Sequence, residues 1–228
     1  MNFLYAMLHP CVKWLRTSPF IIQFFWKVRV PPGAIIHWDT VTLLMRKPLK
    51  KYQKSCKKIL EMGIGQGALN TLFLAQLSGI RVHGVDISVE RVNHSRTTAK
   101  FNNLNVDFWI SDLFGGVKEE YDLIFFNPPY VPTAKGNKLA LTKKLNLNSD
   151  QVWDGGIDGM RLIKKFLGTA KIHMETEGRL LIGVQDIYIS KAQMLTEIER
   201  YHYTFTQIHK EFIIDLLVPT SIYEIRVG

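Results

Sequence analysis

The stretch I-L-E-M-G-I-G-Q-G-A-L-N-T-L-F-L-A, residues 59–75, reads first as a buried strand and then as a helix. Between the two lie three glycines, Gly63, Gly65 and Gly67. Glycines at such a junction let a ligand approach the backbone closely, because a Cβ would collide with it. The stretch therefore predicts a strand–loop–helix unit, with Gly79 ending the helix and a ligand bound at the loop.

The same alternation of short apolar runs and longer amphipathic runs continues along the chain, which is typical of a parallel α/β sheet. It predicts further strands at 81–88, 106–114, 121–130 and 178–185, and further helices at 89–103, 158–174 and 191–201. Ser88 and Asp158 are expected to cap two of these helices. The segments 205–218 and 221–227 are predicted to be β structure paired antiparallel, because no helix-length connection separates them. We expect a Rossmann-like α/β fold whose seven-stranded sheet is mostly parallel, with an antiparallel last strand.

Residues 1–30 are predicted to be a short helical N-terminal extension, and residues 31–228 the main domain. Pro31-Pro32 and Pro48 are interpreted as boundaries ahead of the first strand, with a helix around 40–46 between them. Prolines and charges interrupt the aromatic N-terminus, so no run approaches the roughly 20 residues of a membrane-spanning helix. It also lacks a basic region ahead of an apolar run, so we expect a cytoplasmic protein without a secretory signal. Packing on the main domain, a substrate lid and contact with a membrane surface are all open roles for this extension.

Basic residues concentrate in the first quarter of the chain. Residues 1–60 contain 11 Lys and Arg and one acid, Asp39, for a charge of +10, whereas the remainder contains 18 bases and 19 acids, for −1. Seven of these bases lie in thirteen positions: Arg46, Lys47, Lys50, Lys51, Lys54, Lys57 and Lys58. Such a cluster either contacts phosphates or an acidic partner, or forms a solvated helix face.

Cysteine and histidine patterns point away from disulfide and metal chemistry. The two cysteines, Cys11 and Cys56, are too few for a disulfide framework or a thiolate cluster. The seven histidines show no ligand spacing. We therefore expect no metal site.

Acidic residues at the ends of three predicted strands indicate which ligand the glycine loop binds. Glu61 would repel a phosphate, and the loop lacks the Lys and Ser/Thr of a nucleotide-triphosphate loop. Asp86, which ends the second strand, can accept both hydroxyls of a ribose. Asp112, after the third strand, can accept a hydrogen bond from an adenine amino group. This set of acids suits a cationic nucleoside without phosphates, which is S-adenosylmethionine.

The fourth predicted strand runs directly into Asn127-Pro128-Pro129-Tyr130, where a plain turn would more often use glycine, aspartate or serine. The side-chain oxygen of Asn127 and the backbone carbonyl of Pro128 can accept both hydrogens of an –NH₂ group. Held in this way, a planar nitrogen directs its lone pair at a methyl donor. Tyr130 can stack on the planar group, and Pro129 stiffens the loop.

These residues resemble the class I S-adenosylmethionine-dependent methyltransferases over most of residues 31–228. The likeness rests on E-M-G-I-G-Q-G (61–67), on the acids at 86 and 112 and on W-D-T-V-T-L-L (38–44), which contains the polar pair Asp39 and Thr40. N-P-P-Y is similar to the signature of the branch that methylates amino and amide nitrogens. D-G-G-I-D-G-M (154–160), with Gly155, Gly156 and Asp158, resembles a stretch of the HemK-type glutamine N5-methyltransferases of release factors. The resemblance implies catalytic roles for Asn127, Pro128, Pro129 and Tyr130, and cofactor contacts by Thr40, Glu61, Gly63, Gly65, Gly67, Asp86, Ile87, Asp112, Leu113 and Asn127.

The expected function is therefore methylation of a planar amide or amino nitrogen, with a protein glutamine, for example in a translation protein, as the leading acceptor. The release-factor enzymes carry a helical N-terminal domain for which 30 to 40 residues are too few, so a release factor is only weakly indicated. A nucleic-acid amino group, reached through the basic N-terminal third, is the alternative, and a small molecule is a third. A binding module that has lost activity is disfavoured, since every motif is intact.

Overall fold

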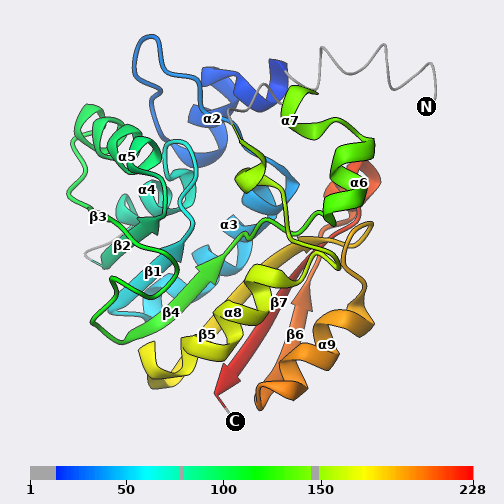
Figure 1. Cartoon of the computed structure of the whole chain (residues 1–228). Coiled ribbons are helices and arrows are strands. Elements are labelled where there is room, and N and C mark those ends of the chain that lie inside the picture. The colour runs from blue at the N-terminus through cyan, green and yellow to red at the C-terminus, as the bar shows by residue number, and fades with distance from the viewer. Residues whose placement is uncertain (1–13, 78–79, 145–148, 228) are drawn as a thin grey trace.

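The computed structural model describes residues 14–77, 80–144 and 149–227 (Figure 1). Its centre is a seven-stranded sheet in the order β3-β2-β1-β4-β5-β7-β6. The strands are β1 (Lys58–Met62), β2 (Arg81–Asp86), β3 (Asp107–Ile110), β4 (Tyr121–Phe126), β5 (Met174–Gln185), β6 (Tyr203–His209) and β7 (Thr220–Val227). Strand β7 runs antiparallel to both of its neighbours, β5 and β6, and the pairs among β1 to β5 are parallel. The predicted fold class is confirmed.

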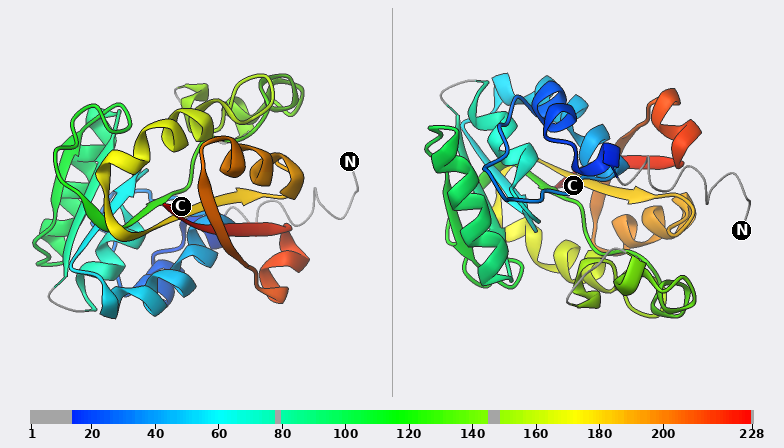
Figure 2. Two further views of the ribbon diagram at one scale, coloured as in Figure 1. Left: turned by 90° about the horizontal axis from the view of Figure 1, so that it is seen from below. Right: turned by 90° about the horizontal axis from the view of Figure 1, so that it is seen from above.

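Helices cover both faces of this sheet. They are α2 (Pro19–Trp26), α3 (Thr40–Tyr52), α4 (Leu69–Ala75), α5 (Val89–Phe101), α6 (Thr133–Lys138), α7 (Leu141–Lys144), α8 (Arg161–Ala170), α9 (Lys191–Arg200) and α10 (Phe212–Leu217), with 3₁₀ turns η1 (Gln53–Ser55), η2 (Asp150–Val152) and η3 (Lys171–His173). Figure 2 shows α8 and α9 on one face and α2, α3 and α4 on the other. The carboxyl ends of the parallel strands all point to the upper end in Figure 1, so the loops that follow them meet there.

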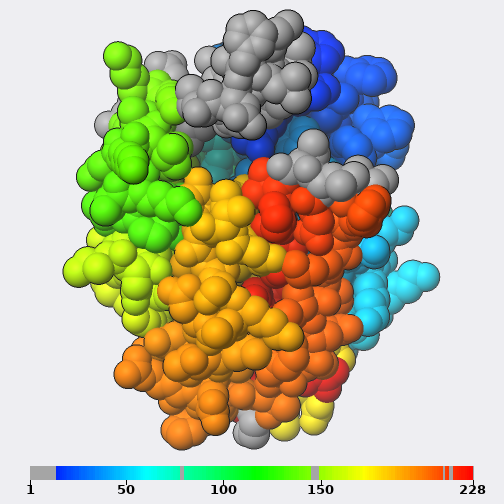
Figure 3. Space-filling model, turned by 90° about the vertical axis from the view of Figure 1, so that its right-hand side faces the viewer, coloured from blue at the N-terminus to red at the C-terminus, as the bar shows by residue number. Residues whose placement is uncertain are grey.

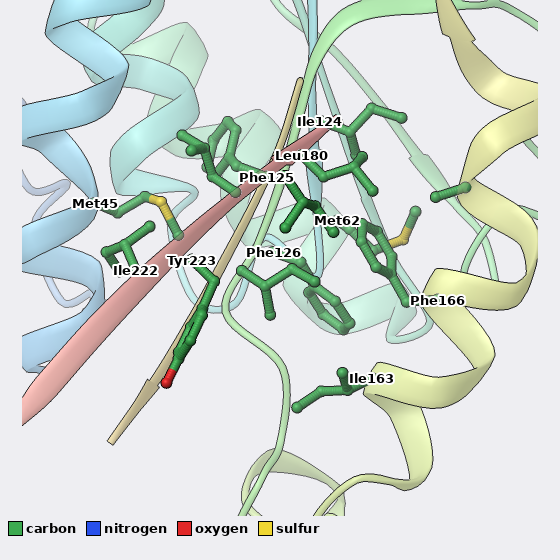
Figure 4. Close-up of a cluster of buried hydrophobic side chains, with 14 of the residues drawn as sticks. Met45, Met62, Ile124, Phe125, Phe126, Ile163, Phe166, Leu180, Ile222 and Tyr223 are labelled. Carbon is green, nitrogen blue, oxygen red and sulfur yellow. The ribbon is translucent and has the colours of Figure 1, made fainter. Parts of the chain in front are cut away.

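The middle of the sheet is apolar where both of its faces are buried, as in residues 123–126 of β4 and 180–184 of β5. Phe125 and Phe126 of β4 and Leu180 of β5 are at most 2% exposed. From one face α8 contributes Phe166 to the same cluster, and from the other α3 contributes Met45 (Figure 4). This rigid centre fixes the loops at the carboxyl end.

The boundary predicted at Pro48, ahead of the first strand, is wrong. Pro48 lies inside α3, which continues to Tyr52, and does not mark a boundary. Leu44, Met45, Pro48 and Leu49 form part of the buried side of this helix. Burial of this apolar side offsets the backbone hydrogen bond that proline cannot donate.

Two further predictions about local structure are also wrong. Residues 212–217 were expected to be β structure but form the short helix α10, and β6 and β7 pair antiparallel on either side of it. Asp158 does not cap α8, whose N-cap is Met160. The Asp158 carboxylate instead accepts from the Met160 N–H at 2.9 Å and pairs with Lys164 Nζ at 2.6 Å, so it holds the turn before the helix.

Helix α2 of the N-terminal extension packs on the main domain. Ile22 and Trp26 are fully buried, and the Trp26 Nε1–H donates to Asn70 Oδ1 of α4 at 2.8 Å. The Arg46 guanidinium of α3 lies over the ring of Trp26, 5.5 Å from its centre. The predicted packing is thus seen for α2, whereas residues 1–13 lie outside the described residues. Within the described part of the chain, no helix is both long and apolar enough to cross a bilayer.

Candidate active site

The glycine loop after β1 is held in place by the end of β2. Gly63 N–H donates to the Val85 carbonyl at 2.8 Å, and Gly65 N–H donates to Asp86 Oδ2 at 3.1 Å. Gly65 has φ +60°, and a Cβ built there would meet nothing within 4 Å. A Cβ on Gly67 would instead meet Ile36 at 2.6 Å. Gly65 therefore presents open space above the loop, which is the cradle that a bound nucleoside needs, whereas Gly67 is required by packing.

Asp86 lies at the carboxyl end of β2 and is 3% exposed. Besides the bond from Gly65, its Oδ1 accepts from the Ser88 N–H at 2.9 Å, and Arg91 Nη1 lies 3.4 Å from the same oxygen. These donors fix the direction of the carboxylate. A carboxylate has about four acceptor positions, and three are occupied, so Oδ2 can still accept from a ribose hydroxyl.

Glu61 is buried and lies close to the first turn of α4. Its Oε2 accepts from the Thr71 N–H at 3.0 Å and from the Thr71 hydroxyl. Burial raises the pKa of Glu61 to about 8, the nearby Asp86 carboxylate adds to the rise, and the two bonds from Thr71 oppose it. At neutral pH this group is therefore largely protonated without a ligand, and a cation nearby would favour its ionised form.

The other predicted cofactor residues occupy the loops after β2 and β3. Ile87 is 51% exposed, and the Asp112 side chain is exposed to solvent. Leu113 has φ +47°, and its carbonyl accepts from the Ser111 hydroxyl at 2.6 Å. The loop thus has a defined shape with an accessible carboxylate, which fits the adenine side of S-adenosylmethionine.

The side chain of Thr40 points toward β5 and β7 and away from the glycine loop. It is 2% exposed, and its hydroxyl lies 3.0 Å from Thr220 Oγ1 and accepts from Gln185 Nε2 at 3.1 Å. These contacts tie the start of α3 to β5 and β7. Its neighbour Asp39, by contrast, faces the loop after β4.

The amide of Asn127 is oriented by Asp39. Asn127 Nδ2 lies 3.2 Å from both carboxylate oxygens of Asp39 and 3.3 Å from the Thr42 hydroxyl. If the amide were flipped, its oxygen would face the Asp39 carboxylate and the two would repel each other. The hydrogen bonds therefore determine which way the Asn127 amide points. The Asn127 oxygen is consequently left to accept from another group. Asp39 is itself held as the N-cap of α3, accepting from the Thr42 N–H at 2.7 Å.

Sequence reasoning noticed Asp39 only as half of a polar pair and missed Thr42 altogether. The signal that was present is the helix N-cap pattern, Asp39 followed three residues later by Thr42. The contact with Asn127 spans 88 residues and has no local signature.

The remaining residues of N-P-P-Y are largely enclosed. Pro128 is buried and Pro129 is half-buried. Tyr130 is 6% exposed, with its ring 6.1 Å from that of Tyr188. Burial, and then the nearby Asp39 carboxylate, raise the pKa of Tyr130 well above its usual 10, so it stays a neutral phenol.

The loop 154–161 braces the segment that follows N-P-P-Y. Val131 N–H donates to the Trp153 carbonyl at 2.8 Å, and Gly155 N–H donates to the Val131 carbonyl at 2.9 Å. Gly159, at φ +79°, lies so close to the Tyr130 carbonyl oxygen that a Cβ would collide with it. The predicted G-G-x-D-G stretch thus packs against the predicted acceptor site.

Asp154 holds this brace together, and sequence reasoning did not single it out. Its Oδ1 accepts from the Thr133 hydroxyl at 2.5 Å and from the Gly156 N–H at 3.0 Å, and Arg161 donates to Oδ2 at 3.0 Å. Although burial opposes ionisation, these bonds lower the pKa of Asp154. The described residues contain no group of His, Cys, Asp or Glu side chains that could hold a metal ion.

The fold and this site define a methyltransferase domain, and a family model supports that assignment. Residues 35–156 match the model of the methyltransferase small domain. The chain therefore belongs to the methyltransferase small domain family.

Two curated relatives illustrate the likeness in sequence. A Methanocaldococcus jannaschii protein, provisionally named a protein N5-glutamine methyltransferase, is 37% identical over 111 residues, which are 49% of this chain and 53% of that protein. The release factor glutamine methyltransferase of Deinococcus radiodurans is 27% identical over 139 residues, 61% of this chain and 49% of the relative. The chain thus spans about half the length of these curated relatives.

Solved structures share the fold. A methyltransferase from Pyrococcus furiosus has a TM-score of 0.63 at 18% identity. The aligned region covers 97% of this chain and 99% of the Pyrococcus chain. A Thermus thermophilus 16S rRNA N2 G1207 methyltransferase, determined in complex with AdoMet and guanosine, has a TM-score of 0.57 at 16% identity. The aligned region covers 86% of this chain and 44% of the Thermus chain.

Proposed function

We propose that this protein transfers a methyl group from S-adenosylmethionine to the amide nitrogen of a protein glutamine side chain. The observation that carries the proposal is the orientation of Asn127, whose amide nitrogen is occupied by Asp39 and Thr42 while its oxygen is left to accept. The names of the relatives support glutamine as the acceptor. S-adenosylmethionine is the cofactor, held by the loop of Gly63, Gly65 and Gly67 and by the acids at 61, 86 and 112.

Bound S-adenosylmethionine supplies an electrophilic methyl group on a positively charged sulfur. The protein's part is to hold the acceptor. The Asn127 oxygen and the Pro128 carbonyl accept the two hydrogens of the –NH₂ group, so its lone pair faces the methyl group. Positive charge develops on this nitrogen as the methyl group arrives, and the fixed acceptors, with the Asp39 carboxylate behind them, stabilise it. The electrons of the carbon–sulfur bond would remain on the sulfur, giving S-adenosylhomocysteine, and the methylated nitrogen would release one proton to water.

Catalysis through these residues needs no nucleophilic side chain and no general base of unusual pKa. A glutamine amide nitrogen is a poor nucleophile because its lone pair is delocalised into the carbonyl. Holding both hydrogens can twist that lone pair out of conjugation, which makes positioning the main contribution. Tyr130, neutral and enclosed, contributes an apolar wall beside the acceptor.

The test is to follow a labelled methyl group. The purified chain is incubated with S-adenosylmethionine labelled in its methyl group and a lysate, and the acceptors are separated into protein, nucleic acid and small molecules. We expect label in protein that acid-free proteolysis releases as N5-methylglutamine. Asp86→Ala, which removes the ribose acceptor, serves as the inactive control. Label appearing in RNA or DNA as a methylated exocyclic amino group would overturn the choice of acceptor, and no label in any fraction would overturn the activity.

A further inference from the structure

The segment of residues 14–26 has two apolar sides. Ile22 and Trp26 of α2 are fully buried against the domain. On its outer side lie Phe20 and Phe24, one helical turn apart and 74% and 60% exposed. A helix that is apolar on its outer side as well as its inner side normally has a second apolar environment to contact.

Trp14 and Leu15, just before α2, are also apolar and exposed, with exposed fractions of 65% and 40%. We call Trp14, Leu15, Phe20 and Phe24 the outer aromatic surface. The side chains of Phe20, Phe24 and Leu15 have no polar atom, so they cannot form hydrogen bonds with a polar partner. A partner that removed them from water would gain their hydrophobic surface.

Basic residues lie near the outer aromatic surface in the sequence. Residues 1–38 contain four bases, Lys13, Arg16, Lys27 and Arg29, and no acid. Lys27 Nζ lies 5.6 Å from the centre of the Phe24 ring, so cation and aromatic group stand together. Lys27 forms no ion pair within the described ranges of the chain.

A second basic segment lies at the same end of the molecule. Residues 123–149 contain four lysines, Lys135, Lys138, Lys143 and Lys144, and no acid. The last three are exposed, and they belong to α6 and α7. Figures 1 and 3 show α2 and the α6–α7 segment at the same upper end, where the parallel strands terminate.

We propose that this end of the protein docks on an anionic membrane surface. Exposed aromatic and aliphatic side chains flanked by lysines match the boundary between lipid headgroups and acyl chains, where both kinds of group are stabilised at once. A nucleic acid would satisfy the lysines but not the aliphatic and phenyl groups. Side chains of this kind give peripheral binding at the headgroup boundary.

Docking in this way brings the candidate active site to the membrane. The Trp38 N–H donates to the Arg16 carbonyl at 3.3 Å, which joins the outer segment to the residue beside Asp39. The acceptor would accordingly be met at the bilayer surface. This inference stands without the proposed function, because it concerns binding and not methyl transfer.

The experiment uses the full chain and large unilamellar vesicles of phosphatidylcholine, alone or with about 30% phosphatidylglycerol. Trp14 gives a built-in probe, because Trp26 and Trp153 are buried and Trp38 and Trp109 are partly buried. We expect sedimentation with the anionic vesicles only, weakened by salt, and a blue shift of tryptophan fluorescence that Trp14→Phe abolishes.

Variants separate docking from folding. The double variant Phe20→Ser/Phe24→Ser should keep its melting temperature and lose about tenfold or more of its vesicle affinity. Ile172→Ser is the matched control, since Ile172 is 72% exposed in η3, away from this surface, and should bind as the wild type does. Lys138→Gln/Lys143→Gln/Lys144→Gln should weaken binding to anionic vesicles and reduce its salt dependence.

Absence of sedimentation with anionic vesicles would overturn the proposal, as would an equal loss in the Ile172→Ser control. Self-association through the outer aromatic surface, or RNA binding that anionic vesicles do not displace, would equally overturn it in favour of a second copy or a nucleic acid.

Discussion

Glu61 shows what burial does to a single residue at this site. Its pKa is raised from 4.5 to about 8, so the folded protein holds a proton that the unfolded chain releases. For an acid with a raised pKa, this stabilisation is complete below about pH 4.5 and is lost as the pH rises to about 8. The free energy of unfolding should therefore contain a component that falls over this range.

We predict that Glu61→Gln, which mimics the protonated side chain, flattens the pH dependence of stability. Urea unfolding at about pH 5 and pH 8.5 should show a smaller decrease in the variant than in the wild type. Glu224 provides the contrasting control: although burial opposes it, hydrogen bonds from His209, Tyr52 and Gln207 lower its pKa to about 2. Its contribution is lost only as the pH falls below about 4.5, so Glu224→Gln should leave the neutral-to-alkaline range unchanged. Equal slopes in Glu61→Gln and wild type would refute the assignment.

At the scale of elements, the brace formed by loop 154–161 sets the position of N-P-P-Y. We predict that Gly159→Ala displaces the Tyr130 carbonyl and lowers the rate of methyl transfer by at least about tenfold while the protein still folds. Gly33→Ala is the matched control, because Gly33 has a similar φ of +77° but nothing within 4 Å of an added Cβ. Both variants carry the same backbone strain, and only the first carries the collision. Equal activity in the two would show that the brace does not position the loop.

Elements were predictable where the chain carries a local signal. The strand–loop–helix unit around the glycines after β1, the capping of α5 by Ser88 and the antiparallel pairing of β7 are confirmed. The helix α10 was missed because F-I-I-D-L-L is too short and too apolar to separate strand from helix periodicity. Pro48 was misread because the packing of α3 outweighs its local effect.

The site was predictable in outline and not in its contacts. The motifs predicted that Asp86, Asp112 and Asn127 lie at one end of a parallel sheet, because the loops that follow parallel strands meet at the same edge. The residues that orient these side chains come from distant segments, as Asp39 does for Asn127. No local sequence pattern therefore predicts them. Thr40 was grouped with the cofactor residues, but its hydroxyl bonds β5 and β7 residues.

For the whole molecule, the division into an extension of residues 1–30 and a domain of residues 31–228 stays a prediction, and α2 makes it testable. Trp26 lies in a hydrophobic cluster with Leu69, Leu72 and Phe73 of α4, which belongs to the main domain. If α2 is part of one cooperative unit, removing that side chain should destabilise the entire fold.

We therefore predict that Trp26→Ala lowers the free energy of unfolding by about 3–5 kcal/mol in a single transition. Trp14→Ala, which removes an exposed ring of the same kind, should change it by less than about 0.5 kcal/mol. Urea denaturation followed by circular dichroism measures both. A small effect of Trp26→Ala, or a separate early transition, would mean that α2 is an appendage to an independent domain.

The proposed chemistry depends on Asn127 acting on the acceptor and leaving cofactor binding alone. Its oxygen lies on the side away from Asp39, so Asn127→Ala removes an acceptor without disturbing the glycine loop or Asp86. Asp39→Asn should act in the same direction and more weakly, because it removes the charge that orients the amide.

The decisive measurement is the single-turnover rate of methyl transfer by Asn127→Ala at saturating S-adenosylmethionine, with cofactor affinity measured on the same sample by calorimetry. We expect the rate to fall by about 10²–10³ while the dissociation constant of the cofactor stays within about twofold of the wild type. A rate close to that of the wild type, with the cofactor site saturated, would contradict the role of Asn127 and place the acceptor elsewhere.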